Sequence, residues 1–123
     1  MNTQTINDIQ AVMSNYFYGI YEGDVARLES AFDKSAVLYG DIKGAPYLKD
    51  VPAYIEGVAS RKPPKVQGEV FGMKVTAIEV LGNNAVVKAH LPMLGYNYYD
   101  FLSLSKLNGQ WKIVNKLFTH VDA

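Results

Sequence analysis

The chain has 123 residues, with 12 basic and 12 acidic side chains, a net charge of zero, 49% hydrophobic residues and no cysteine. This length supports one domain with its own hydrophobic core. Zero net charge excludes the strongly basic surface with which proteins attract nucleic acid or anionic membranes, and the lack of cysteine excludes disulfides and thiolate chemistry. We therefore expect a single domain over residues 1–123, with no nucleic-acid or membrane partner.

Neither a metal site nor a cofactor is expected. The two histidines, His90 and His120, are too far apart to form a recognised metal-binding motif. The first ten residues lack the basic head and apolar run of a leader, and no apolar stretch reaches the ~20 residues of a membrane span. These features favour a cytoplasmic protein.

The first half of the chain is typical of helices. Apolar residues recur at spacings of three and four over about residues 5–21, which predicts one amphipathic helix. Asp24 can cap a short second helix, and Asp50 can cap a third helix that ends before the prolines of RKPPK, residues 61–65. Residues 35–40, between the second and third helices, read as a strand. We expect RKPPK itself to be a solvated turn.

The second half is typical of strands joined by short turns. Extended segments are predicted over residues 66–81 and 85–93, and a terminal hairpin follows. Such strands form an antiparallel meander, and helices from the first half must cover one of its faces, which is the α+β class. Glycines and Pro92 interrupt the strand patterns and mark bulges that bend a sheet. We expect a cone-shaped fold of N-terminal helices packed on a curved antiparallel sheet, with a cavity inside.

The register of the terminal hairpin can be counted from its turn. Asn108-Gly109 favours a two-residue type I′ turn, because both residues tolerate a positive φ angle, so Leu107 faces Gln110. One face then carries Tyr98, Asp100, Leu102, Leu104 and Lys106, opposite Trp111, Ile113, Asn115 and Leu117. A carboxylate in this apolar wall, beside Asn115, must find a partner, become neutral or serve a ligand. Lys116 falls on the opposite face in this register, and we expect burial to raise the pKa of Asp100.

Two segments of the chain resemble a known family. They are NYFYGIYEGDVARLESAFDKSAVLYG, residues 15–40, and YYDFLSLSKLNGQWKIVNKLF, residues 98–118. Together, with helix-rich and strand-rich halves in this order, they resemble the nuclear-transport-factor-2-like superfamily, also named SnoaL-like or ketosteroid-isomerase-like, and within it the branch named putative lumazine-binding. The resemblance covers nearly the whole chain and implies a cystatin-like cone fold. The superfamily includes enzymes, binding modules and adaptors, so the resemblance does not settle the function.

The ketosteroid isomerases of this superfamily stabilise an oxyanion with a tyrosine and a protonated aspartic acid, and the resemblance implies both groups here. Tyr16 stands eight residues before Asp24, as the tyrosine does in that enzyme, and Asp100 of YYDFL lies where the protonated acid does. The position of the catalytic base falls on Gly40. The resemblance therefore implies the two oxyanion-stabilising groups without the base.

Three functions remain open from the sequence. The first is a small-molecule-binding domain whose pocket holds a compact aromatic or heterocyclic ligand. Its expected lining is Tyr16, Phe32, Asp100, Trp111, Ile113 and Asn115. The second is an isomerase or cyclase with Tyr16 and neutral Asp100 as catalytic residues, and with Asp41, Tyr39 or His90 as the base. The third is a structural or adaptor module whose cavity is filled by its own aromatic rings.

The candidate residues also have plain structural roles. Tyr16 fits a helix core, and Asp100 could instead be a solvated strand residue paired with Lys116 or Lys106. We further expect a homodimer, because the outer face of the terminal hairpin is apolar and would suit a second copy. The residues expected on that face are Tyr99, Phe101, Val114 and Phe118.

Overall fold

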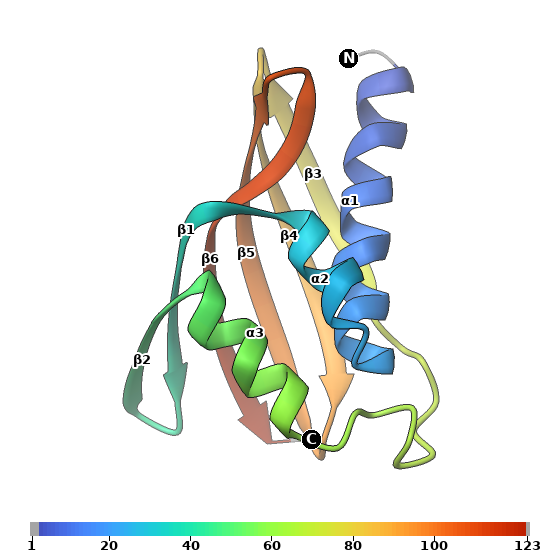
Figure 1. The fold of residues 1–123 in the computed structure, drawn as a ribbon, viewed down its shortest axis with the longest axis vertical. Helices are drawn as coiled ribbons and strands as arrows, with labels where there is room; N and C mark the ends of the chain where they lie inside the picture. Colours follow the sequence, from blue (N-terminus) through green and yellow to red (C-terminus); the bar gives the residue numbers. More distant parts are fainter. Residues whose placement is uncertain (1–2, 123) are drawn as a thin grey trace.

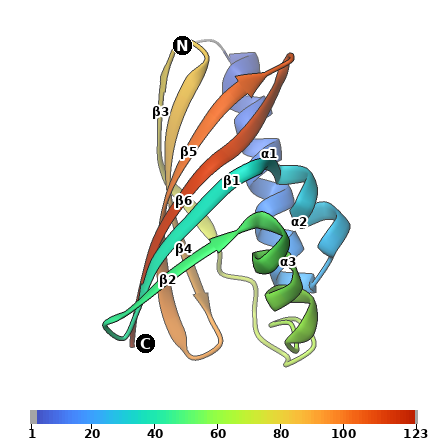
Figure 2. The ribbon, with the colours of Figure 1, turned by 60° about the vertical axis from the view of Figure 1, so that its left-hand side comes forward.

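Three α-helices lie on one side of a six-stranded β-sheet in the computed structural model, which describes residues 3–122 (Figure 1). In chain order the elements are α1 (Thr3–Glu22), α2 (Val25–Ala31), β1 (Phe32–Ile42), β2 (Ala45–Asp50), α3 (Val51–Ser60), β3 (Lys74–Leu81), β4 (Asn84–Met93), β5 (Tyr96–Leu107) and β6 (Gln110–Asp122). Figure 2 shows the curved sheet with all three helices on the same face. The expected α+β architecture is confirmed.

The sheet is mixed rather than wholly antiparallel. Its strand order is β2-β1-β6-β5-β4-β3, and β1 pairs with β6 in parallel while the other neighbours are antiparallel. The expected meander is confirmed from β3 to β6. The expectation is wrong at β1, because the chain reverses in β2 and crosses back through α3 before it enters the meander. The neighbouring strands β1 and β6 therefore run in the same direction.

Two segments differ from the expected strands. Residues 45–50, expected as a connection, form the edge strand β2, a position that tolerates Pro46. Residues 66–73, expected as extended strand, form a loop instead, in which the N–H of Gly68 donates to the carbonyl of Lys65 at 3.1 Å. Local turns thus replace the first part of the predicted strand.

Both predicted helix caps are present. The side chain of Asp24 accepts a hydrogen bond from the backbone N–H of Arg27 at 3.2 Å, and Asp50 caps α3 in the same way. The first two helices pack at Gly19, where a Cβ atom would lie 2.6 Å from the Cβ of Leu28. Glycine permits this close approach, which sets the helical hairpin formed by α1 and α2.

A β-bulge in the terminal hairpin changes which face its second strand presents. The turn itself is as predicted, with positive φ angles at both central residues. Leu104 pairs with Ile113, but Ser103 pairs with Asn115, so β6 contains one extra residue, Val114. The predicted register is wrong beyond this point, because an added residue inverts the alternation of side chains. The side chains of β6 that face the helices beyond the bulge are Lys116, Phe118 and His120, whereas Asn115 and Leu117 face away.

The core lies between the helices and the concave face of the sheet. Its largest fully buried side chains include Ile9, Met13, Tyr16, Ile20, Leu28, Leu38, Val87, Leu91, Leu102, Leu104 and Ile113. The core thus joins the apolar stripe of α1 to the central strands. No helix within residues 3–122 is long and apolar enough to cross a membrane.

Candidate functional site

The buried carboxylate predicted from the hairpin is present in β5. Asp100 is 2% exposed, and the hydroxyl of Tyr16, on α1, donates a short hydrogen bond to its Oδ2 atom. Tyr16 is itself completely buried. The structure therefore brings together the two residues that the sequence singled out, which lie 84 positions apart in the chain. The alternative of a solvated Asp100 is wrong.

A buried lysine completes this group. Lys116 is 6% exposed, and the bulge turns it onto the same face as Asp100. Its Nζ atom lies 4.7, 4.9 and 5.2 Å from the ring centres of Tyr54, Phe118 and Tyr16. The electron-rich faces of these three rings stabilise the ammonium ion. Nζ also donates to the Tyr54 hydroxyl at 3.4 Å, which is long for a hydrogen bond.

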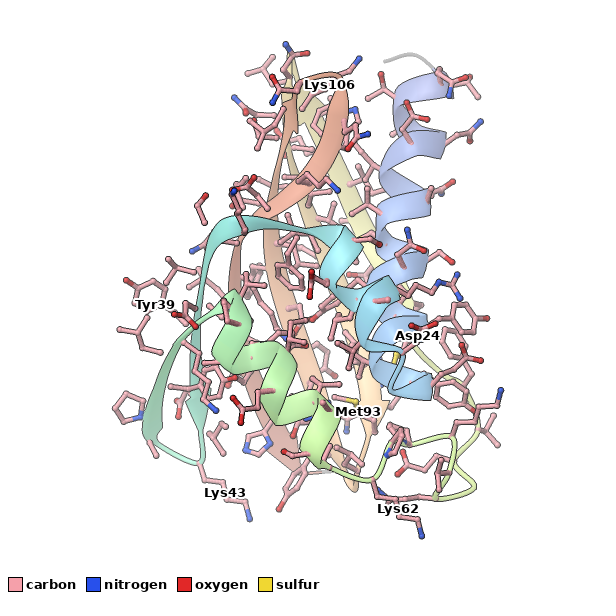
Figure 3. All side chains as sticks on the ribbon, in the orientation of Figure 1. Asp24, Tyr39, Lys43, Lys62, Met93 and Lys106 are labelled. Carbon is pink, nitrogen blue, oxygen red and sulfur yellow. The ribbon has the colours of Figure 1, made fainter. Side chains whose placement is uncertain are left out.

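A cavity of about 70 Å³ lies beside these groups, between α3 and the sheet. Its lining is Ile42, Tyr47, Tyr54, Arg61, Leu91, Met93, Tyr98, Asp100, Lys116 and Phe118. Figure 3 shows Met93 beside the C-terminal half of α3. The volume is that of about two water molecules, well below the roughly 300–1,000 Å³ of pockets for drug-sized ligands. The cavity therefore fits one end of a ligand, a group about the size of two waters.

Burial and nearby charges set the protonation of this site. Burial raises the pKa of Asp100, and the Lys116 charge and the Tyr16 hydrogen bond oppose this rise only in part. Burial and then the Asp100 charge raise the pKa of Tyr16 well above its usual value. Burial lowers the pKa of Lys116, but Tyr54 and Asp100 more than offset this effect, so the net pKa is raised. Tyr16 and Lys116 thus keep their protons, and Asp100 is the group whose charge responds to acid.

Several predicted lining residues belong to the core behind the site. The ring of Phe32 packs edge-on against Tyr16 and Tyr54, with ring centres 5.9 and 5.7 Å apart. Trp111 and Ile113 precede the bulge and lie in the hydrophobic core. None of Tyr16, Phe32, Trp111 and Ile113 is among the residues that line the cavity.

Asn115 was expected beside Asp100, and the structure places it elsewhere. The bulge turns its side chain to the other face of the sheet, where it donates to the carbonyl of Val37 at 3.1 Å. Asp100 is therefore the member of the predicted set that lines the cavity.

Two cationic residues line the cavity that were not among the predicted site residues. Arg61, expected in a solvated turn, follows the last residue of α3 and lines the cavity, and its Nε atom is buried with no hydrogen-bond partner among the described residues. Lys116 faces the cavity only because the bulge reverses the side-chain alternation of β6. A sequence trace of the bulge exists, since the apolar alternation of Trp111 and Ile113 changes phase before Phe118. Arg61 has no comparable signal, because its place depends on where α3 meets the sheet.

The position of the catalytic base is occupied by a ring. At Gly40 a Cβ atom would lie 2.2 Å from Cε1 of Phe118. Asp41 is exposed near the β1–β2 turn, and Tyr39 and His90 lie on the outer face of the sheet. The three candidate bases thus point away from the cavity. Among residues 3–122, no group of three or more histidine, cysteine, aspartate or glutamate side chains could hold a metal ion.

Similarity to known proteins agrees with this architecture. The family model described as Putative lumazine-binding matches residues 4–119. An NTF2-like protein of unknown function from Shewanella baltica OS155 has a TM-score of 0.84 at 20% identity, with 100% of this chain and 98% of that chain covered. One from Silicibacter pomeroyi DSS-3 has a TM-score of 0.84 at 21% identity, with 98% and 100% covered. One from Methylobacillus flagellatus KT has a TM-score of 0.89 at 23% identity, with 98% and 95% covered.

None of the curated proteins matches the chain. The solved structures show the fold alone, because their sequence identity is low, whereas the family model spans nearly all of the sequence. The resemblance expected from residues 15–40 and 98–118 is confirmed. The chain belongs to the Putative lumazine-binding family and has the NTF2-like fold.

Proposed function

We propose that this protein binds an aromatic or heterocyclic molecule at the cavity between α3 and the sheet, with one end of the molecule inside the cavity. The observation that carries the proposal is the presence of Asp100 and Lys116, both deeply buried, in the wall of a cavity otherwise lined mainly by apolar and aromatic side chains. Pockets for small molecules have this composition, an apolar wall with a few convergent polar groups.

The cost of burying these groups supports the proposal. Asp100 and Lys116 lose hydration on folding, which an apolar pair of the same volume would not. A polar network that serves only the fold satisfies its own donors and acceptors. Here the hydrogen bond to Tyr54 uses one of the three N–H donors of Lys116, and at 3.4 Å it is weak. A ligand in the cavity would supply acceptors for the others.

An isomerase or cyclase is the alternative function for the same site. It requires Tyr16 and neutral Asp100 to donate to a substrate oxygen while a base removes a proton. In the structure the Tyr16 hydroxyl donates to Asp100 and does not line the cavity. Phe118 fills the space at the base position. This geometry supports ligand binding better than proton abstraction.

We also propose that two copies associate through the outer face of the sheet. A row of side chains crosses five strands in register: Leu48, Tyr39, Leu117, Phe101 and Lys88. Its four apolar members are 47–62% exposed. A second copy presents the same row, so a symmetric pairing would bury both. Phe118, expected on this face, lines the cavity instead, and a dimer of this kind leaves the cavity free.

Retention of a small molecule tests the binding proposal. Ile42→Trp adds a large ring to the cavity lining, and Val86→Trp, at a 48% exposed position on the outer face, is the matched control. We expect native mass spectrometry to find a retained molecule on wild type and Val86→Trp, or ligand-observed NMR to detect binding of lumazine or benzoate, and Ile42→Trp to show neither. Wild-type protein that retains nothing and binds neither probe contradicts the proposal.

A further inference from the structure

We propose that the cavity selects ligands that carry a carboxylate on a planar ring, and that Arg61 and Lys116 hold the negative charge. This inference rests on the proposed binding function and names the chemical class of its ligand. It follows from the charges of the lining, from its unsatisfied donors, and from its size and aromatic rings.

The charged residues of the lining favour an anion. Three lining residues carry charge, and two of them, Arg61 and Lys116, are cations. Asp100 is the single acid, so the lining is positive whether Asp100 is ionised or neutral. Charges inside a low-dielectric cavity act strongly on a ligand, because little water screens them. A cationic ligand would meet repulsion from two sides.

Two cationic residues of the lining have donors that are poorly satisfied. The Nε–H of Arg61 is buried and has no partner among the described residues. The ammonium of Lys116 makes one long bond, to the Tyr54 hydroxyl. Buried donors are costly when they stay unpaired. A carboxylate offers two oxygens to such a pair of cations, and guanidinium groups are well matched to its planar geometry.

The size of the cavity and its rings indicate the rest of the ligand. About 70 Å³ has room for the two oxygens of a carboxylate in place of about two waters. A ring attached to this group would extend along the lining toward Tyr47 and Tyr98, whose aromatic side chains are half-buried. Stacked or edge-on contacts with these rings favour a planar ligand.

Asp100 makes the affinity for an anionic ligand depend on pH. The groups that act on Asp100 are Tyr16 from α1 and Lys116 from β6, and Tyr54 from α3 lines the same cavity and contacts Lys116. Burial already raises the pKa of Asp100, and a carboxylate placed beside it would raise this pKa further by like-charge repulsion. Binding is therefore coupled to proton uptake by Asp100. The neutral acid can then donate a hydrogen bond to the ligand.

Three probes of one size test this inference: benzoate, benzamide and benzylamine, which are anionic, neutral and cationic. NMR titration of the wild-type protein is expected to give benzoate at least a tenfold lower Kd than benzamide, with weaker binding still for benzylamine. Arg61→Gln and Lys116→Met are each expected to reduce the preference for benzoate severalfold. Lys106→Met, which removes an exposed lysine beside the turn of the terminal hairpin, is the matched control and should leave the preference unchanged.

The outcomes separate the two proposals. If benzamide binds as tightly as benzoate to the wild-type protein, the cavity still binds small molecules but the selection of anions is overturned. If none of the three probes binds, the selection of anions is overturned, and the binding function is then decided by a retained molecule or by lumazine. A loss of preference in Lys106→Met equal to that in Arg61→Gln would assign the effect to general surface charge and overturn the inference. Arg61 is half-buried, so its variant keeps the test valid if Lys116→Met does not fold.

Discussion

Gly40→Ala tests the finding that Phe118 occupies the place where a catalytic base would stand. The added Cβ atom would lie 2.2, 2.3 and 2.7 Å from three carbons of the Phe118 ring. Carbon atoms in contact are normally about 3.5–4.0 Å apart. The ring must therefore move by more than an ångström, or the pairing of β1 with β6 must shift.

The expected cost follows from this overlap. Adding a methyl group to a well-packed site costs about 1–3 kcal/mol when neighbours must leave their preferred positions. Gly57→Ala is the matched control, because the same methyl group in the middle of α3 would find only the Nζ of Lys49, at 3.9 Å. Removing a helical glycine there is expected to stabilise the protein by about 0.5–1 kcal/mol.

Urea unfolding of both variants, repeated in a Phe118→Ala background, measures the effect. Gly40→Ala is expected to lower the free energy of unfolding in the wild-type background, and to cost less than about 0.5 kcal/mol once the ring is removed. An unchanged unfolding free energy for Gly40→Ala would refute the reasoning. So would an equal loss in the two backgrounds, because the ring would then not be the obstacle.

Three further expectations follow from the site and the hairpin. Burial raises the pKa of Asp100 in the folded protein above its pKa in the unfolded chain. The contribution of the protonated Asp100 to stability is therefore greatest below the pKa of the unfolded chain, and it is lost as the pH rises through the pKa of the folded protein. Unfolding at a series of pH values should show Asp100→Asn gaining stability relative to wild type over that window, and a drift in the other direction counts against a neutral acid. Gly109→Val places a β-branched residue at a φ of 80° and should cost about 1 kcal/mol or more, whereas an unchanged melting temperature would exclude this turn. Phe101→Glu should convert a wild-type dimer to the 13.7 kDa single chain in sedimentation velocity, and wild-type protein that already sediments as one chain contradicts the proposed pairing.

Local signals in the sequence predicted local structure well. Asp24 and Asp50 cap their helices because a carboxylate before a helical run accepts from free N–H groups, whatever the rest of the fold does. The same holds for the Asn108-Gly109 turn. Asp100 was also predicted to be buried with a raised pKa, since its neighbours along β5 are apolar and the extra residue lies in β6, so the alternation of β5 is unchanged.

The rest of the site depends on features that no short segment encodes. The extra residue Val114 turns Lys116 toward Asp100 and Asn115 away from it, and counting from the turn cannot detect an added residue. Arg61 enters the cavity because α3 ends above the sheet, which is set by packing between distant elements. The parallel pairing of β1 with β6 joins strands far apart in the chain, so strand patterns alone do not reveal it.

The central claim is that a small molecule enters the cavity under α3, and the methyl group of Met93 reports on this directly. The chain has four methionines, of which Met93 lines the cavity and Met13 lies 1% exposed in the core and outside the lining. Protein labelled with ¹³C at its methionine methyl groups and titrated with benzoate is predicted to show a saturable shift of the Met93 signal while the Met13 signal stays in place. A Met93 signal that does not move when benzoate binds, or that moves together with Met13, contradicts the account.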